Sequence, residues 1–254
     1  MIDIHSHVLY GVDDGARTLE DSIAMVQIAA ASGTTDLVVT PHANLEFPFQ
    51  PDVIQERLAE ISAATGEAVR LYSGCDFHLS HENITDAISN PTKYTIDHKC
   101  YLLVEFSDLL IFHNTPEIFA RLLDAGMIPI VTHPERNGLL RQRIDQIAAW
   151  VDAGSRVQIT GQSLLGVFGG RAREFCESLL DRGLVHFVAS DAHDCEYRPP
   201  RLKDAYAWIR KKYGEALAET LCVTNPRAAI EGDPLDLGAT ALLPEPRRWY
   251  QLWR

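Results

Sequence analysis

Short apolar runs rich in β-branched residues alternate along this chain with longer segments of helical period. The runs cover residues 2–5, 35–40, 69–75, 100–106, 128–132, 156–160 and 184–190. Leu102-Leu103-Val104 is apolar at consecutive positions, as in strands that are buried on both faces of a parallel sheet. Repeated strand-then-helix units predict a parallel α/β fold, and about seven or eight of them favour a closed barrel. A doubly wound open sheet is the competing architecture.

The segments between these runs carry helix signals. Thr18 and Asp21 have the spacing of a capping box, and Gly33 marks the expected end of the helix that they begin. Further helices are predicted over residues 51–65, 116–125, 141–153, 171–182 and 201–213.

The chain has 254 residues, is 46% hydrophobic, and has no Gly/Ser/Pro-rich linker before its last residues. We therefore predict one domain over residues 1–235 and a basic, aromatic tail over 236–254. No apolar run is long enough to span a bilayer, and the first residues lack the pattern of a signal peptide. We expect a cytoplasmic protein that is not embedded in a membrane; the sequence leaves homo-oligomer formation open.

Charge and cysteine spacing exclude some classes of function. The formal net charge of -12 opposes binding to an extended nucleic acid, which normally requires a basic face. The five cysteines never form a CxxC pair, so neither a disulfide framework nor a thiolate zinc site is predicted. Bound cations would locally reverse the repulsion, so a small phosphate group stays compatible with this charge.

Imidazoles and carboxylates recur where the apolar runs end. The residues at these positions are His5, His7, His42, Asp76, Glu105, His133, Asp191 and His193. Because the carboxyl ends of strands in a parallel barrel meet at one mouth, residues that are distant in sequence are expected to converge there. Any one of these residues alone is better explained as a hydrogen-bonded core residue or a helix cap. Their repetition at successive strand ends favours a shared site.

This set of side chains suits metal ions. Imidazole with carboxylate, and without thiols, is compatible with zinc, manganese or iron, and the share of oxygen ligands favours manganese. The number of side chains exceeds what one tetrahedral ion uses, so we predict two or three divalent ions.

The motifs together resemble a known family. Asp3-Ile4-His5-Ser6-His7 with Ser190-Asp191-Ala192-His193 is similar to the polymerase and histidinol phosphatase (PHP) family of metal-dependent phosphoesterases. The start MIDIHSHVLYGVDDGA, with Val104-Glu105-Phe106, Thr132-His133-Pro134-Glu135-Arg136 and Arg198-Pro199-Pro200, resembles the bacterial capsule-associated CpsB/CapC type. The resemblance runs to about Arg227. It implies a distorted (β/α)7 TIM-like barrel that holds three metal ions, often manganese.

The resemblance also implies which residues bind each ion. The first ion would take His5, His7, Asp76 and Asp191; the second, Asp76, Glu105 and His133; the third, Asp14, His42 and His193. Asp14 enters on resemblance alone. The family usually has Glu where this chain has Asp76, which is shorter by one methylene.

The activity that the resemblance implies is dephosphorylation of protein phosphotyrosine, with a bacterial tyrosine kinase of exopolysaccharide or capsule synthesis as the partner. A metal-activated hydroxide is expected to attack phosphorus. Arg136 and Arg198 are expected to clamp the phosphoryl oxygens, because guanidinium matches phosphate bidentately. His42 or His193 is expected to assist the leaving group. A surface salt bridge is the alternative for either arginine.

Three other interpretations are considered. A small-molecule phosphatase of the histidinol-phosphatase type would use the same metals, and a non-catalytic metal-binding module would hydrolyse nothing. A cysteine-dependent phosphatase would need Cys176 and Arg182, which have the Cys-x5-Arg spacing. That segment has no glycine and the period of an amphipathic helix, so we reject Cys176 as a nucleophile and expect a buried, inert thiol.

Overall fold

The computed structural model describes residues 1–236, apart from the side chain of Glu67. Its strands are β1 (Ile2–Asp3), β2 (Asp36–Val39), β3 (His42–Ala43), β4 (Arg70–Ser73), β5 (Asp76–His78), β6 (Tyr101–Glu105), β7 (Ile128–Thr132), β8 (Arg156–Thr160) and β9 (Phe187–Ala189). Its helices are α1 (Leu19–Ala31), α2 (Pro51–Thr65), α3 (His81–Ser89), α4 (Thr115–Asp124), α5 (Ile144–Asp152), α6 (Gly161–Leu164), α7 (Gly170–Asp181), α8 (Lys203–Tyr213), α9 (Glu215–Glu219) and α10 (Asn225–Glu231).

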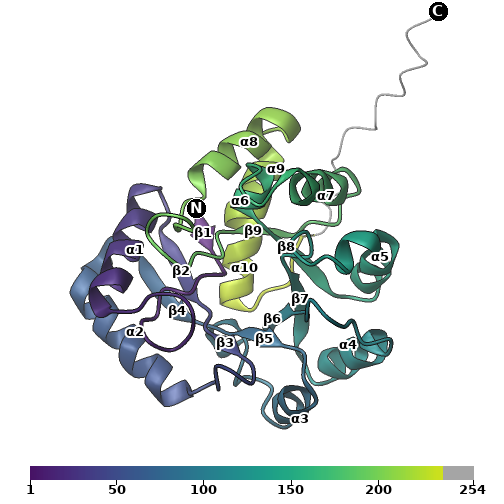
Figure 1. Ribbon diagram of the computed structural model, residues 1–254, viewed down its shortest axis with the longest axis horizontal. Helices are drawn as coiled ribbons and strands as arrows, with labels where there is room; N and C mark the ends of the chain where they lie inside the picture. Colours follow the sequence, from purple (N-terminus) through teal and green to yellow (C-terminus); the bar gives the residue numbers. More distant parts are fainter. Residues whose placement is uncertain (237–254) are drawn as a thin grey trace, which may run out of the picture.

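The strands form two parallel sheets. One has the order β1-β2-β4, and the other has the order β3-β5-β6-β7-β8-β9. The strands lie at the centre of the molecule, with α1 to α5, α7 and α8 around them (Figure 1). The parallel α/β prediction is therefore confirmed, whereas the strands do not form one continuous closed sheet.

Two strands pass from one sheet to the other at a kink. β2 continues into β3 across Thr40 and Pro41, and β4 continues into β5 across Gly74 and Cys75. A Cβ atom on Gly74 would lie 2.9 Å from Cγ1 of Val38, so this close approach requires glycine. The kinks carry the chain onward to His42 and Asp76, which begin β3 and β5.

The segments after β1 and β9 run side by side. The N–H of His7 donates to the carbonyl of Ala192 at 2.8 Å, and the N–H of Asp191 donates to the carbonyl of His5 at the same distance. Ser6 and Ala192 form an isolated parallel bridge. The first and last strand ends are therefore neighbours, although no sheet ladder joins them.

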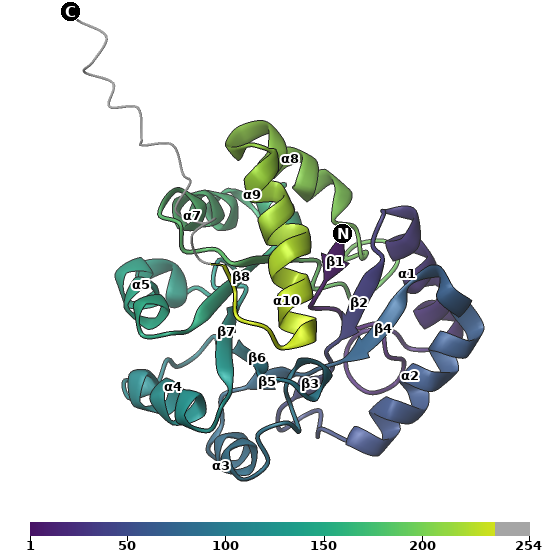
Figure 2. The ribbon, with the colours of Figure 1, turned by 180° about the vertical axis from the view of Figure 1, so that it is seen from behind.

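Both faces of the strands β6 to β9 are buried. Leu103, Ile130 and Phe187 belong to a cluster that also contains Ala229 and Ile230 of α10. Their neighbours along the strands, such as Leu102 and Val131, pack beneath the surrounding helices. Figure 2 shows α10 crossing the strands on the face opposite to that of Figure 1. Burial on both faces explains why the predicted strands are apolar at consecutive positions.

The predicted runs and helices are confirmed. Each of the apolar runs contains a strand, and each predicted helix is present within three residues at either end. Thr18 forms the expected capping box with Asp21, and α1 ends before Gly33. Several elements were not predicted from the sequence because they are short or follow kinks: β3, β5, α3, α6, α9 and α10. The tail predicted over 236–254 lies outside the described residues except for Asp236.

Among residues 1–236, no helix has the length and hydropathy needed to cross a bilayer.

Candidate metal centre

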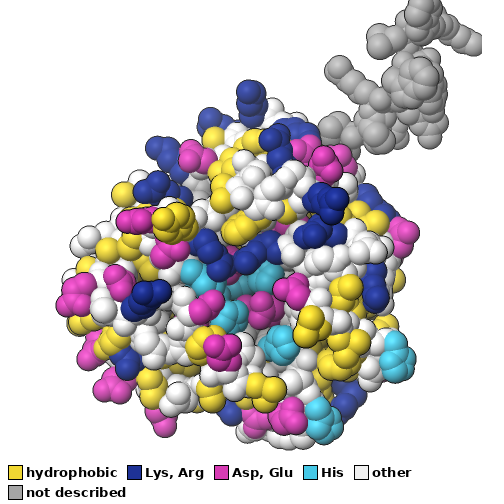
Figure 3. Space-filling model, in the orientation of Figure 1, with side chains coloured by type: hydrophobic (Ala, Val, Ile, Leu, Met, Phe, Trp, Pro, Cys, Tyr) yellow, Lys and Arg dark blue, Asp and Glu magenta, His cyan; other side chains and the backbone are white. Residues whose placement is uncertain are grey.

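The predicted site residues lie together where the strands end. Figure 3 shows a hollow near the middle of this face, with histidine and acidic side chains on its floor and Lys or Arg side chains along one edge. The ligand atoms of the histidines and acids fall into four groups, each within 4.8 Å. The groups are His7, Asp14, His42 and His193; His5, His7 and Asp76; His5, His133 and Asp191; and His42, Asp76 and Glu105.

These groups contain every residue that was predicted as a ligand, but they divide them differently. The third expected set, Asp14 with His42 and His193, is present and also includes His7. Asp191 groups with His133 as well as His5, and Asp76 with Glu105 groups with His42. The four groups form one connected centre, because each shares a member with at least one other: His5, His7, His42 and Asp76 all belong to two groups.

His5 and His7 face each other at its floor. Their Nε2 atoms are 3.2 Å apart, and both are 3.5 Å from Oδ1 of Asp191. The two side chains are fully buried. Two residues apart on an extended chain, they lie on the same side of the segment that β1 begins, as the sequence predicted.

Asp76 lies between two of the histidines. Its Oδ2 is 3.5 Å from Nε2 of His5 and 3.3 Å from Nδ1 of His42. The residue is fully buried, and Thr132 donates a hydrogen bond to the other carboxylate oxygen at 3.5 Å. The carboxylate therefore approaches both histidines, although it is shorter by one methylene than that of Glu.

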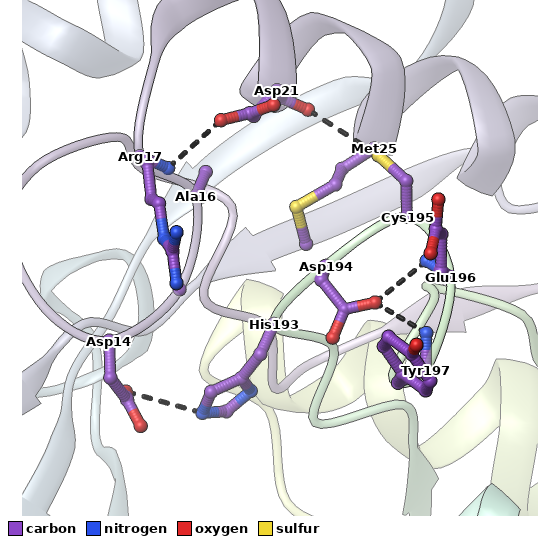
Figure 4. A pocket seen from close by; sticks show the side chains of 11 residues that line it. Asp14, Ala16, Arg17, Asp21, Met25, His193, Asp194, Cys195, Glu196 and Tyr197 are labelled. Carbon is purple, nitrogen blue, oxygen red and sulfur yellow. Dashed lines mark hydrogen bonds and ion pairs between the residues drawn. The ribbon is translucent and has the colours of Figure 1, made fainter.

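Asp14 occupies the outer edge of the centre. Its Oδ1 is 3.3 Å from Nε2 of His42 and 3.4 Å from Nε2 of His193. Figure 4 shows Asp14 and His193 at one side of a cavity of about 400 Å³ that Arg17 and Tyr197 also line. Solvent can therefore reach the outer edge of the centre, where Asp14 and His193 lie.

Two of the candidate ligands have left-handed backbones. His133 has φ 30° and Asp191 has φ 52°. Such conformations are costly for residues with a Cβ atom and concentrate at functional sites. These residues lie after β7 and β9, and Arg136 and Arg198 come three and seven positions later in the chain.

Arg136 and Arg198 both contact Asp191. Nη2 of Arg198 is 2.7 Å from Oδ2 of Asp191, and Nη1 of Arg136 bonds to the same oxygen. The guanidinium carbons lie 4.5 Å and 6.0 Å from the ring centre of Phe168. The arginines thus form a basic edge on the centre, held against one aromatic ring.

The acids and histidines of the centre shift one another's pKa. Burial alone lowers the pKa of His5, but the carboxylates of Asp76 and Asp191 raise it to about 9. Burial likewise opposes the charge on His42, whose pKa Asp14 and Asp76 raise to about 11. Burial and the neighbouring imidazoles hold the pKa of His7 far below its usual value. The centre therefore requires positive charge to balance its buried carboxylates.

Two buried atoms that lack hydrogen bonds show that this donor set fits metal ions. Oδ2 of Asp76 and Nδ1 of His42 are buried and lie 3.3 Å apart, but neither atom makes a hydrogen bond. Buried polar atoms are almost always partnered, so an orphaned carboxylate oxygen beside an orphaned imidazole nitrogen fits a cation. The nitrogen and oxygen ligands, with no cysteine in the described groups, match the predicted divalent metals.

Several residues that hold the ligands and the arginines of the centre in place were not predicted from the sequence. Asp13 bonds to Nδ1 of His7 at 2.8 Å, and Gln158 bonds to Nδ1 of His5 at 2.9 Å. Asp194 accepts backbone hydrogen bonds at 2.7 Å from Glu196 and at 3.1 Å from Arg198, which shapes the loop that carries that arginine. Two features of the sequence could have drawn attention to them: the adjacent acids Asp13 and Asp14, and the polar Gln158 within an apolar run.

The remaining predictions concern residues outside the centre. Cys176 is fully buried within α7, and burial raises the pKa of its thiol, so the predicted buried thiol on a helix is confirmed. His186 is buried and accepts a hydrogen bond from the N–H of Val157 at 3.2 Å, as a core histidine should. His78 approaches Oε2 of Glu105 at 3.8 Å and lies at the edge of the hollow.

Comparison with known proteins agrees with this arrangement. The family described as "Capsular polysaccharide synthesis, CpsB/CapC" matches residues 1–231. Over 211 residues the chain is 35% identical to CapC of Staphylococcus aureus, covering 81% of this chain and 82% of that protein. It is 31% identical to the tyrosine-protein phosphatase YwqE of Bacillus subtilis (strain 168), covering 85% and 87%.

A solved structure supports the same relationship. It comes from work on YwqE from Bacillus subtilis and CpsB from Streptococcus pneumoniae, described as unique metal-dependent tyrosine phosphatases. The TM-score is 0.87 at 28% identity, over 92% of this chain and 96% of the other. With the match over residues 1–231, these similarities establish that the chain belongs to the CpsB/CapC family.

Proposed function

We propose that this protein is a metal-dependent phosphatase that removes phosphate from tyrosine residues of a protein. The convergence of His5, His7 and Asp76 with the other predicted ligands in one buried centre carries the proposal. Family membership supports it, because the relatives YwqE and CpsB are named tyrosine-protein phosphatases.

We assign the metal ligands as the resemblance implies. These are His5, His7, Asp14, His42, Asp76, Glu105, His133, Asp191 and His193. Two or three divalent ions, manganese first and iron or zinc as alternatives, would supply Lewis-acid activation of water and charge neutralisation at phosphorus. The oxygen share of this ligand set supports manganese.

The chain's own residues then handle the phosphoryl group. Arg136 and Arg198 present cationic forks at the edge of the centre, and Nε of Arg198 has no hydrogen-bond partner. These donors suit phosphoryl oxygens, on which negative charge gathers during transfer. His42 or His193, at the solvent-facing edge beside Asp14, is suited to assist the tyrosyl oxygen as it leaves. A phenol has a pKa near ~10, so its departure requires less proton transfer than that of an alkyl alcohol.

An open rim favours a peptide over a small alcohol. Next to the centre lies a second cavity of about 470 Å³, which Asn44, His78 and Ser107 line. Each of these follows a proposed ligand by two residues along the chain. Leu45 and Leu109, on the same loops, are 94% and 92% exposed. A chain that extends on either side of a phosphotyrosine can rest on such a rim, whereas a small phosphate ester has no need of it.

The proposal includes finer expectations. Two observations support a distorted (β/α)7 TIM-like barrel. β2 continues into β3 and β4 into β5, which connects the two sheets, and a bridge joins Ser6 to Ala192. The domain would span residues 1–235. The phosphotyrosine-bearing partner would be a bacterial tyrosine kinase of capsule or exopolysaccharide synthesis, met in the cytoplasm.

Purified protein loaded with Mn²⁺ should be assayed in parallel on a phosphotyrosine peptide, histidinol phosphate and p-nitrophenyl phosphate. The proposal predicts a kcat/KM for the peptide that exceeds that for histidinol phosphate by at least tenfold. The reverse preference would favour the small-molecule phosphatase. Metal binding without hydrolysis of any of the three would favour the non-catalytic module.

A further inference from the structure

Asp13 lies directly behind His7. Its Oδ2 is 2.8 Å from Nδ1 of the imidazole, and both side chains are fully buried. The same oxygen accepts from the backbone N–H of His42 at 3.2 Å, and Oδ1 accepts from the N–H of Gly15 at 2.9 Å. Asp13 therefore joins the loop after β1 to two of the proposed ligands without itself belonging to any of the ligand groups.

The loop allows this approach only because of its glycine. A Cβ atom on Gly15 would collide with the carbonyl oxygen of His7, and the N–H of Ala16 donates to that oxygen at 3.1 Å. The chain therefore turns back tightly over His7. This turn brings Asp13 inward while Asp14, the next residue, faces His42 and His193 at the outer edge.

The contact from Asp13 decides which ring nitrogen of His7 carries hydrogen. A carboxylate only accepts hydrogen bonds, so Nδ1 of the neutral ring must donate and Nε2 keeps its lone pair. That lone pair belongs to the atom that lies 3.2 Å from Nε2 of His5 and 3.5 Å from Asp191. It is available at the floor of the centre.

His5 has the same arrangement from a different strand. Its Nδ1 lies 2.9 Å from Oε1 of Gln158, a fully buried residue of β8. The amide oxygen accepts from Nδ1–H, so in the neutral ring Nε2 of His5 is the nitrogen left free to bind a metal ion. β8 was the predicted strand with no candidate ligand, and Gln158 gives it a contact with the centre.

We propose that Asp13 and Gln158 are positioning residues, which hold His7 and His5 in the Nδ1–H tautomer and aim both Nε2 atoms at one metal ion. Metal-ligating histidines generally donate their other N–H to such a partner, and loss of the partner weakens metal affinity by about 10- to 100-fold. The inference rests on the metal binding of the proposed function and does not depend on which phosphate ester is hydrolysed.

The test compares Mn²⁺ affinity of the full chain with that of Asp13→Ala, by titration of Mn²⁺ into chelator-treated protein. We expect affinity to fall at least tenfold. In ¹⁵N NMR spectra of the metal-free protein, His7 should change from the Nδ1–H tautomer to a mixture or to Nε2–H. Affinity within threefold of wild type with His7 still in the Nδ1–H tautomer would overturn the role of Asp13.

Asp13 also accepts two backbone hydrogen bonds, so a second pair of variants separates positioning from loop structure. Gln158→Leu removes the acceptor for His5 from a strand, whereas Gln158→Glu keeps one. We expect at least tenfold weaker Mn²⁺ binding for the first and binding within threefold of wild type for the second. Equal losses in both, or none in either, would overturn the role of Gln158.

Failure of the proposed function gives a different pattern. A wild-type protein that binds Mn²⁺ but does not hydrolyse a phosphotyrosine peptide would contradict the phosphatase proposal. The affinity and tautomer changes in the variants would still be measurable in that case.

Discussion

Arg198 bonds to Asp191 twice through one guanidinium nitrogen: Nη2 lies 2.7 Å from the carboxylate and 3.1 Å from the backbone carbonyl oxygen. Arg136 reaches the same carboxylate from the turn after β7. Because Asp191 also lies beside His5 and His7, the two arginines are fixed relative to the metal centre. This relationship joins the proposed phosphate clamp to the proposed metal ligands.

Removal of either arginine should impair turnover. We expect Arg136→Ala and Arg198→Ala each to lower kcat on a phosphotyrosine peptide by about 10²-fold, the usual effect of losing one donor to a transition-state oxyanion. Steady-state kinetics on protein with verified metal content would measure this. Arg198→Lys, which keeps the charge but not the fork, should recover part of the loss. Unchanged kcat at full metal content would remove the arginine from the mechanism.

Asp76 should be required as a carboxylate. In Asp76→Asn an amide replaces the oxygen that faces His5 and His42, so we expect at least one metal ion to be lost and turnover to fall with it. Elemental analysis of the purified variant checks the first point. Asp76→Glu, which has the residue usual in the family, should retain metal. Full metal content in Asp76→Asn would contradict the assignment of Asp76 as a shared ligand.

Cys176 should be dispensable for activity. Cys176→Ser leaves a hydroxyl at a fully buried position in α7, with an expected stability cost of about 1–3 kcal/mol. The kcat on a phosphotyrosine peptide should match that of wild type below the melting temperature. A loss of more than tenfold in properly folded protein would revive the thiol mechanism.

His186 should make the fold sensitive to acid. Burial first, and then Arg156, lower its pKa in the folded state to about 3, whereas an unfolded chain has the ordinary value near 6.5. Between these values the unfolded chain binds the extra proton, so stability is lost as pH falls. We expect the free energy of unfolding at pH 5 to be about 2 kcal/mol lower than at pH 7.5.

Denaturant unfolding at pH 7.5 and pH 5 measures this loss. His186→Asn keeps an acceptor for the N–H of Val157 but has no group that titrates in this range. Its stability should therefore fall by about 2 kcal/mol less than that of wild type between the two values. An equal fall in both proteins would show that His186 does not carry the effect.

Much of the fold could be predicted because its strands have a local signature. A strand such as Leu102-Leu103-Val104 is buried on both faces, so its sequence is apolar at every position. The short strands β3 and β5 lack that signature, since each has two or three residues and follows a kink at Pro41 or Gly74. Whether the sheets close depends on contacts between distant segments, such as Ser6 with Ala192.

The candidate site was predictable to the extent that its residues follow strands. His5, Glu105 and Asp191 lie at or directly after the ends of apolar runs, so their convergence could be expected. Asp14 lies on a loop with no periodic signal and required the family resemblance. Asp13 and Gln158 could not be assigned, because their roles come from contacts with imidazole rings on other segments.

The most direct test of the account is metal dependence at the histidine pair. Metal content, melting temperature and phosphotyrosine hydrolysis should be measured for wild type and for a His5→Ala/His7→Ala double variant, before and after chelation and with Mn²⁺ added back. We predict that chelation lowers the melting temperature and abolishes activity of wild type, and that Mn²⁺ restores both. The double variant should hold less metal, melt lower and stay inactive. Equal metal content, equal melting and retained activity in the double variant would contradict the central claim.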